Sequence, residues 1–197
     1  VGHAPYYNAV VKDGRYSVSG MFTDVSVTWC ELVGKTIGII GMGNIGQGVA
    51  KVAQAFGMNV CYYSTSGTSH CKDYPSLPLE QLLAESDIVS IHAPLNDKTN
   101  GLIGEKELSM MKPSAFIVNM GRGGIVEEEA LVKAVDEGVI AGAALDVYCV
   151  EPLPADSCFL KAKHPERFRL APHVAWASEE ARERLLGMVA DNIAKGW

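Results

Sequence analysis

Residues Thr36 to Gly46 read TIGIIGMGNIG. The first five residues of this stretch are apolar or small, which is typical of a buried strand, and glycines follow at positions 41, 43 and 46. Beyond Ile45, apolar side chains recur at helical spacing as far as Phe56. A strand, a glycine turn and a helix in this order predict a dinucleotide-binding turn, with a plain strand-to-helix turn as the weaker alternative.

Each position of the turn has a physical reason to bind a dinucleotide. Gly41 permits the tight turn, Gly43 lets a pyrophosphate approach the backbone, and Gly46 lets the helix pack closely on the strand. Asn44 and Ile45 open the helix, whose free N–H groups and positive dipole end attract phosphate. These five residues are therefore predicted to bind the cofactor.

The choice between NAD and NADP depends on the end of the second strand, about 20 residues further on. An Asp or Glu there holds the ribose hydroxyls of NAD and repels the 2′-phosphate of NADP. Here Tyr63 is followed by Ser64 and Thr65, and no carboxylate occurs before Asp73. The two hydroxyls can accept either cofactor and no Arg stands beside them, so the choice stays open.

Strand-like and helical patterns alternate from Lys35 onward, which predicts a doubly wound, Rossmann-type α/β fold around a parallel sheet. Gly57 and Gly138 stand just past two of the helices, where a left-handed stop residue is expected. The predicted strands are 36–40, 59–63, 88–92, 115–119, 141–147 and 168–171, and the predicted helices are 45–56, 79–85, 105–111, 128–137 and 178–194.

The whole chain, residues 1–197, is expected to form one dinucleotide-binding domain. It divides into an N-terminal helix (1–13), an irregular connection (14–34), a Rossmann core (35–178) and a C-terminal helix (179–197). The first helix lacks a capping residue before it, and the last runs into Gly196 and Trp197 without a clear continuation. We therefore expect that the chain is truncated at both ends.

Composition narrows the possible functions. With 48% hydrophobic and 20% charged residues the chain resembles a soluble globular protein, and its net charge of −6 argues against a nucleic-acid partner. No apolar run approaches the roughly 20 residues that span a bilayer, so no membrane association is expected and a cytoplasmic location is the default. The five cysteines lack the close pairs of metal or redox sites, and no metal site is predicted.

Three further segments each follow a predicted strand: NMGRGG at 119–124, DVYCVEP at 146–152 and APHVAW at 171–176. The carboxyl ends of parallel strands line the ligand crevice of an open α/β sheet. These loops can therefore bring Arg122, Glu151 and His173 together beside the cofactor. Taken alone, each residue has an ordinary alternative as a surface or turn residue.

With GKTIGIIG at 34–41, HAPL at 92–95 and these three segments in the same order and spacing, the sequence closely resembles the D-isomer-specific 2-hydroxyacid dehydrogenase family. The resemblance covers nearly the whole chain. It implies the coenzyme domain of a two-domain subunit whose substrate-binding domain is absent here. It also implies a homodimer formed through coenzyme domains, with the helix around Tyr6 and Val10 as a candidate contact and packing within the domain as the alternative.

The resemblance implies catalytic roles for three residues. Arg122 would hold the substrate carboxylate and carbonyl as a planar, charged fork. His173 would give a proton to the 2-oxo group, and Glu151 would pair with His173 and favour its charged form. It further implies contacts with the cofactor by His92, Pro94, Thr99, Met120, Gly121, Asp146 and His173. For His92, an ordinary packed role is the alternative.

The implied activity is hydride transfer between a nicotinamide cofactor and a small D-2-hydroxy acid or 2-oxoacid. The carboxylate of Glu151 distinguishes the chain from formate dehydrogenases of the superfamily, which use an amide there. Trp176 is similar to glycerate dehydrogenase and hydroxypyruvate reductase members, so glycerate, hydroxypyruvate and glyoxylate are the candidate substrates. Without its other domain the chain is expected to be inactive or weakly active. The alternative is a nucleotide-sensing binding module, since corepressors resembling the family keep the three residues.

Overall fold

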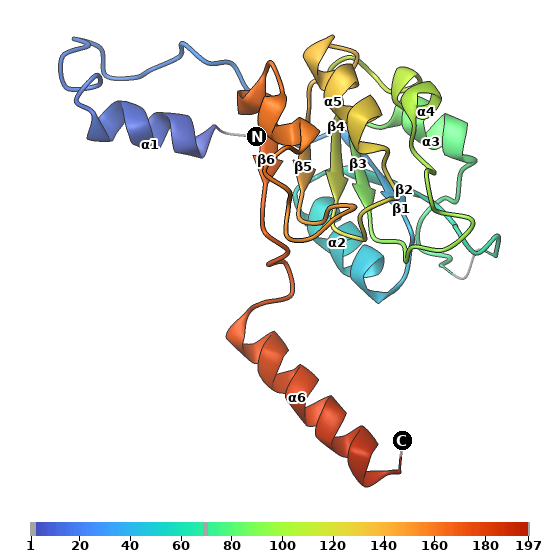
Figure 1. Cartoon of the computed structure of the whole chain (residues 1–197). Coiled ribbons are helices and arrows are strands. Elements are labelled where there is room, and N and C mark those ends of the chain that lie inside the picture. The colour runs from blue at the N-terminus through green and yellow to red at the C-terminus, as the bar shows by residue number, and fades with distance from the viewer. Residues whose placement is uncertain (1–2, 69–70, 197) are drawn as a thin grey trace.

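The computed structural model describes residues 3–68 and 71–196 (Figure 1). The predicted domain limits at Val1 and Trp197 lie outside the described residues. Six strands form one sheet in the order β2-β1-β3-β4-β5-β6, and every neighbouring pair is parallel. Their bounds are β1 Thr36–Ile40, β2 Asn59–Tyr63, β3 Ile88–Ile91, β4 Phe116–Asn119, β5 Gly142–Leu145 and β6 Phe168–Leu170.

Helices pack on both faces of this sheet, which confirms the predicted doubly wound α/β class. On one face α3, α4 and α5 bury a large apolar cluster that contains Leu82, Leu108 and Leu131. On the other, α2 packs Ala50 and Ala53 against β1 and β2. The bounds are α1 Ala4–Lys12, α2 Asn44–Ala55, α3 Leu79–Glu85, α4 Glu105–Ser109, α5 Glu128–Asp136 and α6 Glu179–Ala194, with short 3-10 turns η1 Cys158–Lys161 and η2 Pro165–Arg167 before β6.

The predicted elements all occur, and the differences lie at their ends. Strand β3 ends at Ile91 rather than His92, and α4 ends at Ser109 rather than Met111 because the amides of Met110 and Met111 bond carbonyls three residues back, as in a 3-10 turn. Gly57 and Gly138 take the left-handed conformation expected of helix stops, with φ of 78° and 73°. Ser178 caps α6, its hydroxyl accepting the Ala181 amide at 3.3 Å.

The sheet order places a topological switch point between β1 and β3. The chain leaves β1 toward β2 on one side, and then returns through α3 to β3 on the other side of β1. Ligands of open α/β sheets bind in the crevice at such a point, beyond the carboxyl ends of the strands. The glycine turn follows β1 directly, so it lies in that position.

Two segments extend away from the sheet in Figure 1. At the N-terminus, α1 and the irregular segment that follows it form an arm, which we define as residues 4–29. At the other end, α6 projects from the domain and has no buried residue. In the part of the chain that the structure describes, no helix combines the length and apolarity needed to span a membrane.

Candidate active site

The glycine turn depends on two close backbone contacts. Gly41 takes a φ of 94°, and a Cβ there would meet the backbone nitrogen of Ala93 at 2.8 Å. A Cβ on Gly46 would collide with the carbonyl oxygen of Gly41. Only glycine allows the turn to pack both against the loop after β3 and against its own helix. This agrees with the tight turn expected at Gly41 and the close packing expected at Gly46.

The start of α2 is open for an anion. A Cβ on Gly43 would meet no atom within 4 Å, and Asn44 and Ile45 are exposed. No side chain caps the 12-residue helix at this end, so its first N–H groups and its positive dipole end face outward. This arrangement fits the pyrophosphate of a dinucleotide, as the sequence predicts for Gly43, Asn44 and Ile45.

The loop after β2 is held by its own hydroxyl groups. The Ser64 hydroxyl donates to the carbonyl oxygen of Thr68 at 2.7 Å and lies 3.1 Å from the Ser66 hydroxyl. Ser64 and Thr65 are half-buried. The loop presents neither a carboxylate for a ribose nor an Arg for a 2′-phosphate between Ser64 and Thr68.

The segment His92–Thr99 lies between the glycine turn and the Arg122 loop. Ala93 approaches Gly41 on one side, and its carbonyl oxygen would meet a Cβ on Gly121 at 2.8 Å on the other. A side chain at position 121 would therefore collide with the backbone of this segment. Thr99 is fully buried and closes the segment, its hydroxyl donating to the Pro94 carbonyl at 2.6 Å.

His92 lies at the carboxyl end of β3, beside the turn. Its Nε2 is 2.9 Å from the Ser90 hydroxyl, whereas its Nδ1 is buried and has no partner among the described residues. Burial lowers the pKa of His92, so the neutral imidazole is favoured at neutral pH. A buried ring nitrogen left unpaired beside the crevice fits either contact with a ligand or a packed role.

Asn119 shapes the Arg122 loop, a role that the sequence analysis missed. Its buried side chain accepts the Gly121 amide at 3.0 Å and donates to the Arg122 carbonyl at 2.9 Å. An Asn that bonds the backbone of the next residues forms a local turn, which an amide at a strand end before Gly-Arg-Gly could have suggested. Half-buried Met120 lies inside this turn, and the exposed Arg122 guanidinium donates to the Gly121 carbonyl at 2.8 Å.

Glu151 and His173 are brought together, as predicted. His173 Nδ1 lies 2.7 Å from Glu151 Oε2, while Glu151 Oε1 accepts the Tyr148 amide at 2.9 Å. The hydrogen bond from His173, then that from Tyr148, and the nearby positive charge of Arg122 hold the pKa of Glu151 below its ordinary value. Because an ionised carboxylate only accepts, Nδ1 is the donor and Nε2 is left for a ligand.

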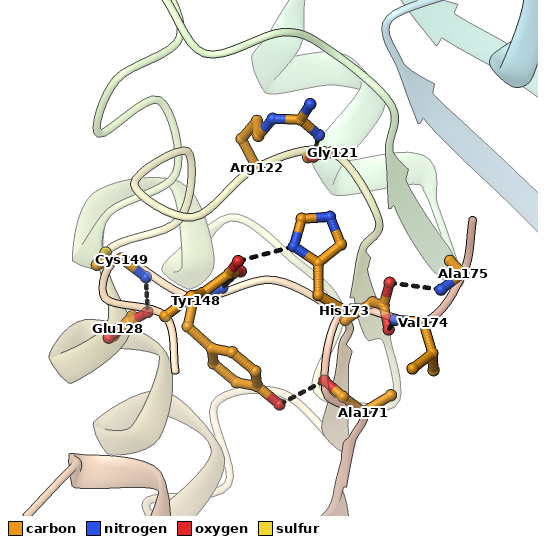
Figure 2. A network of polar contacts seen from close by, with 11 residues as sticks. Gly121, Arg122, Glu128, Tyr148, Cys149, Ala171, His173, Val174 and Ala175 are labelled. Atoms are coloured by element: carbon orange, nitrogen blue, oxygen red, sulfur yellow. Dashed lines mark hydrogen bonds and ion pairs between the residues drawn. The ribbon is translucent and has the colours of Figure 1, made fainter. Parts of the chain in front are cut away.

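Asp146 faces inward to the His173 loop. The residue is 2% exposed, and its carboxylate accepts hydrogen bonds from the amides of Val174 and Ala175, each at 2.8 Å (Figure 2). His173 itself has a φ of 53°, a left-handed conformation that is costly for a residue with a side chain. Capture of the next two amides by Asp146 stabilises this conformation. Both Asp146 oxygens therefore accept hydrogen bonds from the protein itself. The contact with the cofactor that the resemblance implies would be additional to these two bonds.

The structure thus gathers the three predicted catalytic residues at the carboxyl edge of the sheet. Figure 2 shows Arg122 above the imidazole of His173 in that view, with the His173 loop below. The predicted cofactor residues differ in their exposure. Gly43, Asn44 and Ile45 are open to a ligand, whereas Thr99, Gly121 and Asp146 are buried and support neighbouring loops.

The family model for the D-isomer specific 2-hydroxyacid dehydrogenase NAD binding domain matches residues 2–175. The chain is 50% identical over 168 residues to a glyoxylate reductase of Aeropyrum pernix, covering 83% of this chain and 49% of the relative. It is 43% identical over 186 residues to a glyoxylate reductase of Korarchaeum cryptofilum, covering 93% and 54%. The solved structure of an acyclic imino acid reductase in complex with NADPH and D-Arg has a TM-score of 0.81 and 33% identity, covering 94% of this chain and 58% of that one.

These relatives are close to twice as long as the stretch that they share with this chain, which spans 49% and 54% of the two glyoxylate reductases. The matched family model covers the sheet, the glycine turn and all three of Arg122, Glu151 and His173. The chain belongs to the D-isomer specific 2-hydroxyacid dehydrogenase family, in which it corresponds to the NAD binding domain.

Proposed function

We propose that the protein carrying this domain is an oxidoreductase that interconverts a small 2-oxoacid and its D-2-hydroxy acid with NAD(H) or NADP(H). The observation that carries the proposal is the 2.7 Å pair of Glu151 and His173 next to the Arg122 loop. This pair lies at the same edge of the sheet as the open glycine turn. A dinucleotide-binding fold needs the turn but not this pair of ionisable side chains.

The side chains have distinct tasks in this reaction. When bound, the dinucleotide exchanges a hydride with the carbon that carries the oxo or hydroxy group. Arg122 binds the substrate carboxylate through its exposed guanidinium, which in the structure donates to the Gly121 carbonyl. His173 Nε2 delivers a proton to the oxo oxygen and takes it back in the reverse direction. Glu151 accepts the hydrogen bond from Nδ1 and thereby leaves Nε2 toward the substrate.

Glyoxylate and hydroxypyruvate are the substrates that we propose first. The relatives named glyoxylate reductase are 40–50% identical to this chain, and a hydroxypyruvate reductase of Blautia hydrogenotrophica is 34% identical over 193 residues. Both acids combine a carboxylate with an adjacent carbonyl group, which suits Arg122 and His173. For the cofactor, the hydroxyl-lined loop after β2 supports use of both NADH and NADPH.

The test follows NADH and NADPH oxidation by the full-length protein with glyoxylate, hydroxypyruvate and pyruvate. His173→Ala is expected to lower kcat by roughly 10²–10⁴-fold, the usual contribution of a general acid. His164→Ala is the matched control. His164 also pairs with a carboxylate, that of Glu166 at 3.3 Å, but it is the N-cap residue of η2 and lies away from the site. Equal turnover of wild type and His173→Ala would contradict the proposal. Cofactor binding without turnover by the wild type would support a nucleotide-sensing module instead.

We also propose that residues 1–197 alone bind the dinucleotide but turn over substrate slowly. Closure of a second domain excludes water from a site of this kind, and the site described here is open on the side of Arg122. The division of the chain into segments and the cytoplasmic location stay predictions from the sequence.

A homodimer formed through the N-terminal arm is the assembly that we propose. The side chains named from the sequence, Tyr6 and Val10, pack within the arm: Val10 is buried, and the Tyr6 hydroxyl lies 2.9 Å from that of Ser26. Further along the arm, however, Val18, Phe22 and Val25 are 85%, 89% and 76% exposed. Exposed apolar side chains gathered on one projecting segment support a protein–protein contact.

A further inference from the structure

Tyr148 lies where the three loops of the candidate site meet, although neither the sequence motifs nor the proposed chemistry give it a task. It follows β5 and is 7% exposed. Its ring packs edge-on against Phe159 at 5.9 Å between centroids, and Phe159 packs in the same way on Phe168. Because the ring is fixed by this aromatic row, the position of its hydroxyl group is fixed as well.

The backbone of Tyr148 contacts two of the loops. Its amide donates to Glu151 Oε1 at 2.9 Å, which orients the carboxylate whose other oxygen meets His173. Its carbonyl group lies so close to Gly123 that a Cβ at that position would overlap it. The Arg122 loop is therefore packed directly on the peptide of Tyr148, and glycine at 123 is required for this approach.

The hydroxyl group of Tyr148 reaches the third loop. It donates to the carbonyl oxygen of Ala171 at 3.0 Å, two residues before His173 (Figure 2). Burial, followed by the charge of Asp146, raises the pKa of the phenol, so the hydroxyl remains protonated and donates at any pH at which the enzyme would work. The His173 loop is thus tied on one side by Tyr148 at Ala171, and on the other by Asp146 at Val174 and Ala175.

We propose that Tyr148 is a positioning residue, whose hydroxyl group holds the His173 loop in register with Glu151 and with the Arg122 loop. The inference rests on the proposed function, because it assigns Tyr148 an effect on proton transfer through His173. Tyr148 itself touches neither substrate nor cofactor in this role. Ala171 keeps the bond from its amide to the Leu145 carbonyl at 2.9 Å, but without the Tyr148 bond its carbonyl group is no longer held. Since His173 is in a left-handed backbone conformation, the loop can then relax and move Nε2 away from the reacting oxygen.

The test is a double-mutant cycle in the full-length protein. Tyr148→Phe keeps the ring and removes only the hydrogen bond to the Ala171 carbonyl. We expect it to lower kcat about tenfold, while the KM values for cofactor and 2-oxoacid change less than about twofold. In the His173→Ala background the same substitution is expected to change kcat less than twofold, because the group that it positions is gone. Tyr74→Phe is the matched control: it removes a phenol hydrogen bond of 3.3 Å to the side-chain oxygen of Gln54, outside the site and outside the arm.

A second measurement separates positioning from a general loss of stability. The proton on His173 Nδ1, shared with Glu151, is expected to give a downfield NMR signal in the wild type that weakens in Tyr148→Phe and is unchanged in Tyr74→Phe. Full kcat in Tyr148→Phe, or an equal loss in both backgrounds, would overturn the positioning role. If His173→Ala itself retained turnover, the proposed function would fail instead, and the two failures are thereby distinguished.

Discussion

Single glycines decide how closely the glycine turn can pack. Gly46 and Gly48 lie two residues apart in α2, yet their surroundings differ. A Cβ on Gly46 collides with the Gly41 carbonyl and comes within 3.2 Å of the Ile39 side chain, whereas a Cβ on Gly48 meets nothing within 4 Å. Substitutions at the two positions therefore test whether the motif requires glycine for its backbone flexibility or because it has no side chain.

We predict that Gly46→Ala lowers the free energy of unfolding by about 1–3 kcal/mol, the usual cost of overpacking. It should also weaken dinucleotide binding at least tenfold, because the turn must move away from the helix. Gly48→Ala should raise stability by about 0.5–1 kcal/mol, since alanine favours a helix, and leave binding within twofold. Chemical denaturation and cofactor titration of both variants provide the measurement. Similar behaviour of the two variants would show that space at Gly46 is not the determinant.

At the scale of elements, one carboxylate joins the amino ends of two strands. Asp87, just before β3, accepts the Thr36 amide of β1 at 2.9 Å and the Lys112 ammonium at 3.1 Å, with Lys35 at 3.9 Å. Burial alone would raise the pKa of Asp87, but the Thr36 hydrogen bond and then the two lysines hold it below its ordinary value. The amino edge of the sheet is thus stabilised by an ionised group.

Asp87→Asn is expected to lower the free energy of unfolding by about 1–3 kcal/mol at pH 7, as for other hydrogen bonds to charged groups. The sign of the pH dependence follows from the lowered pKa. The stabilisation is complete above the unfolded-state pKa of about 3.9 and is lost as the pH falls through the still lower folded-state pKa. Urea unfolding of both proteins between pH 7 and pH 3 measures this, with Asp73→Asn as an exposed control. A stability difference that stays constant down to pH 3 would contradict the assignment.

In the whole molecule, two segments project from the domain, and of these the arm lines a pocket with Tyr6 and Thr28 beside Phe116 of the sheet. The arm exposes large apolar side chains before β1, and α6 exposes Leu186, Met188 and Ile193 to at least 63%. The two apolar clusters on the faces of the sheet include no residue of either segment (Figure 1). Assembly and domain contacts can therefore change while the dinucleotide turn and the Glu151–His173 pair stay intact.

For the arm, we predict that Phe22→Asp converts the proposed dimer to monomer at micromolar concentration, as measured by light scattering after size-exclusion chromatography. A charge placed in an apolar interface must be desolvated without a partner, which weakens association strongly. Phe56→Asp is the matched control, since Phe56 is 59% exposed at the end of α2 and outside the arm. An unchanged dimer in Phe22→Asp, or a wild type that is already monomeric, would exclude this interface.

The sequence predicted the class of fold and the order of its elements because both depend on local periodicity. The spacing of apolar residues marks β1 and α2, and glycine chemistry marks the turn between them. Resemblance to a family then indicated Arg122, Glu151 and His173 at positions far apart in the chain. Element ends were less predictable, since a last turn such as that after Ser109 is decided by weak competition between hydrogen-bond patterns.

What the tertiary structure alone decided is how the loops are held. No local pattern reveals that the Tyr148 hydroxyl meets the Ala171 carbonyl, that Asp146 turns inward to two amides, or that Gly121 packs on Ala93. These contacts join residues brought together only by the parallel sheet, whose carboxyl ends converge on one edge. The motifs therefore indicate which chemical groups the site contains, whereas the positions of those groups depend on how three loops pack around Tyr148.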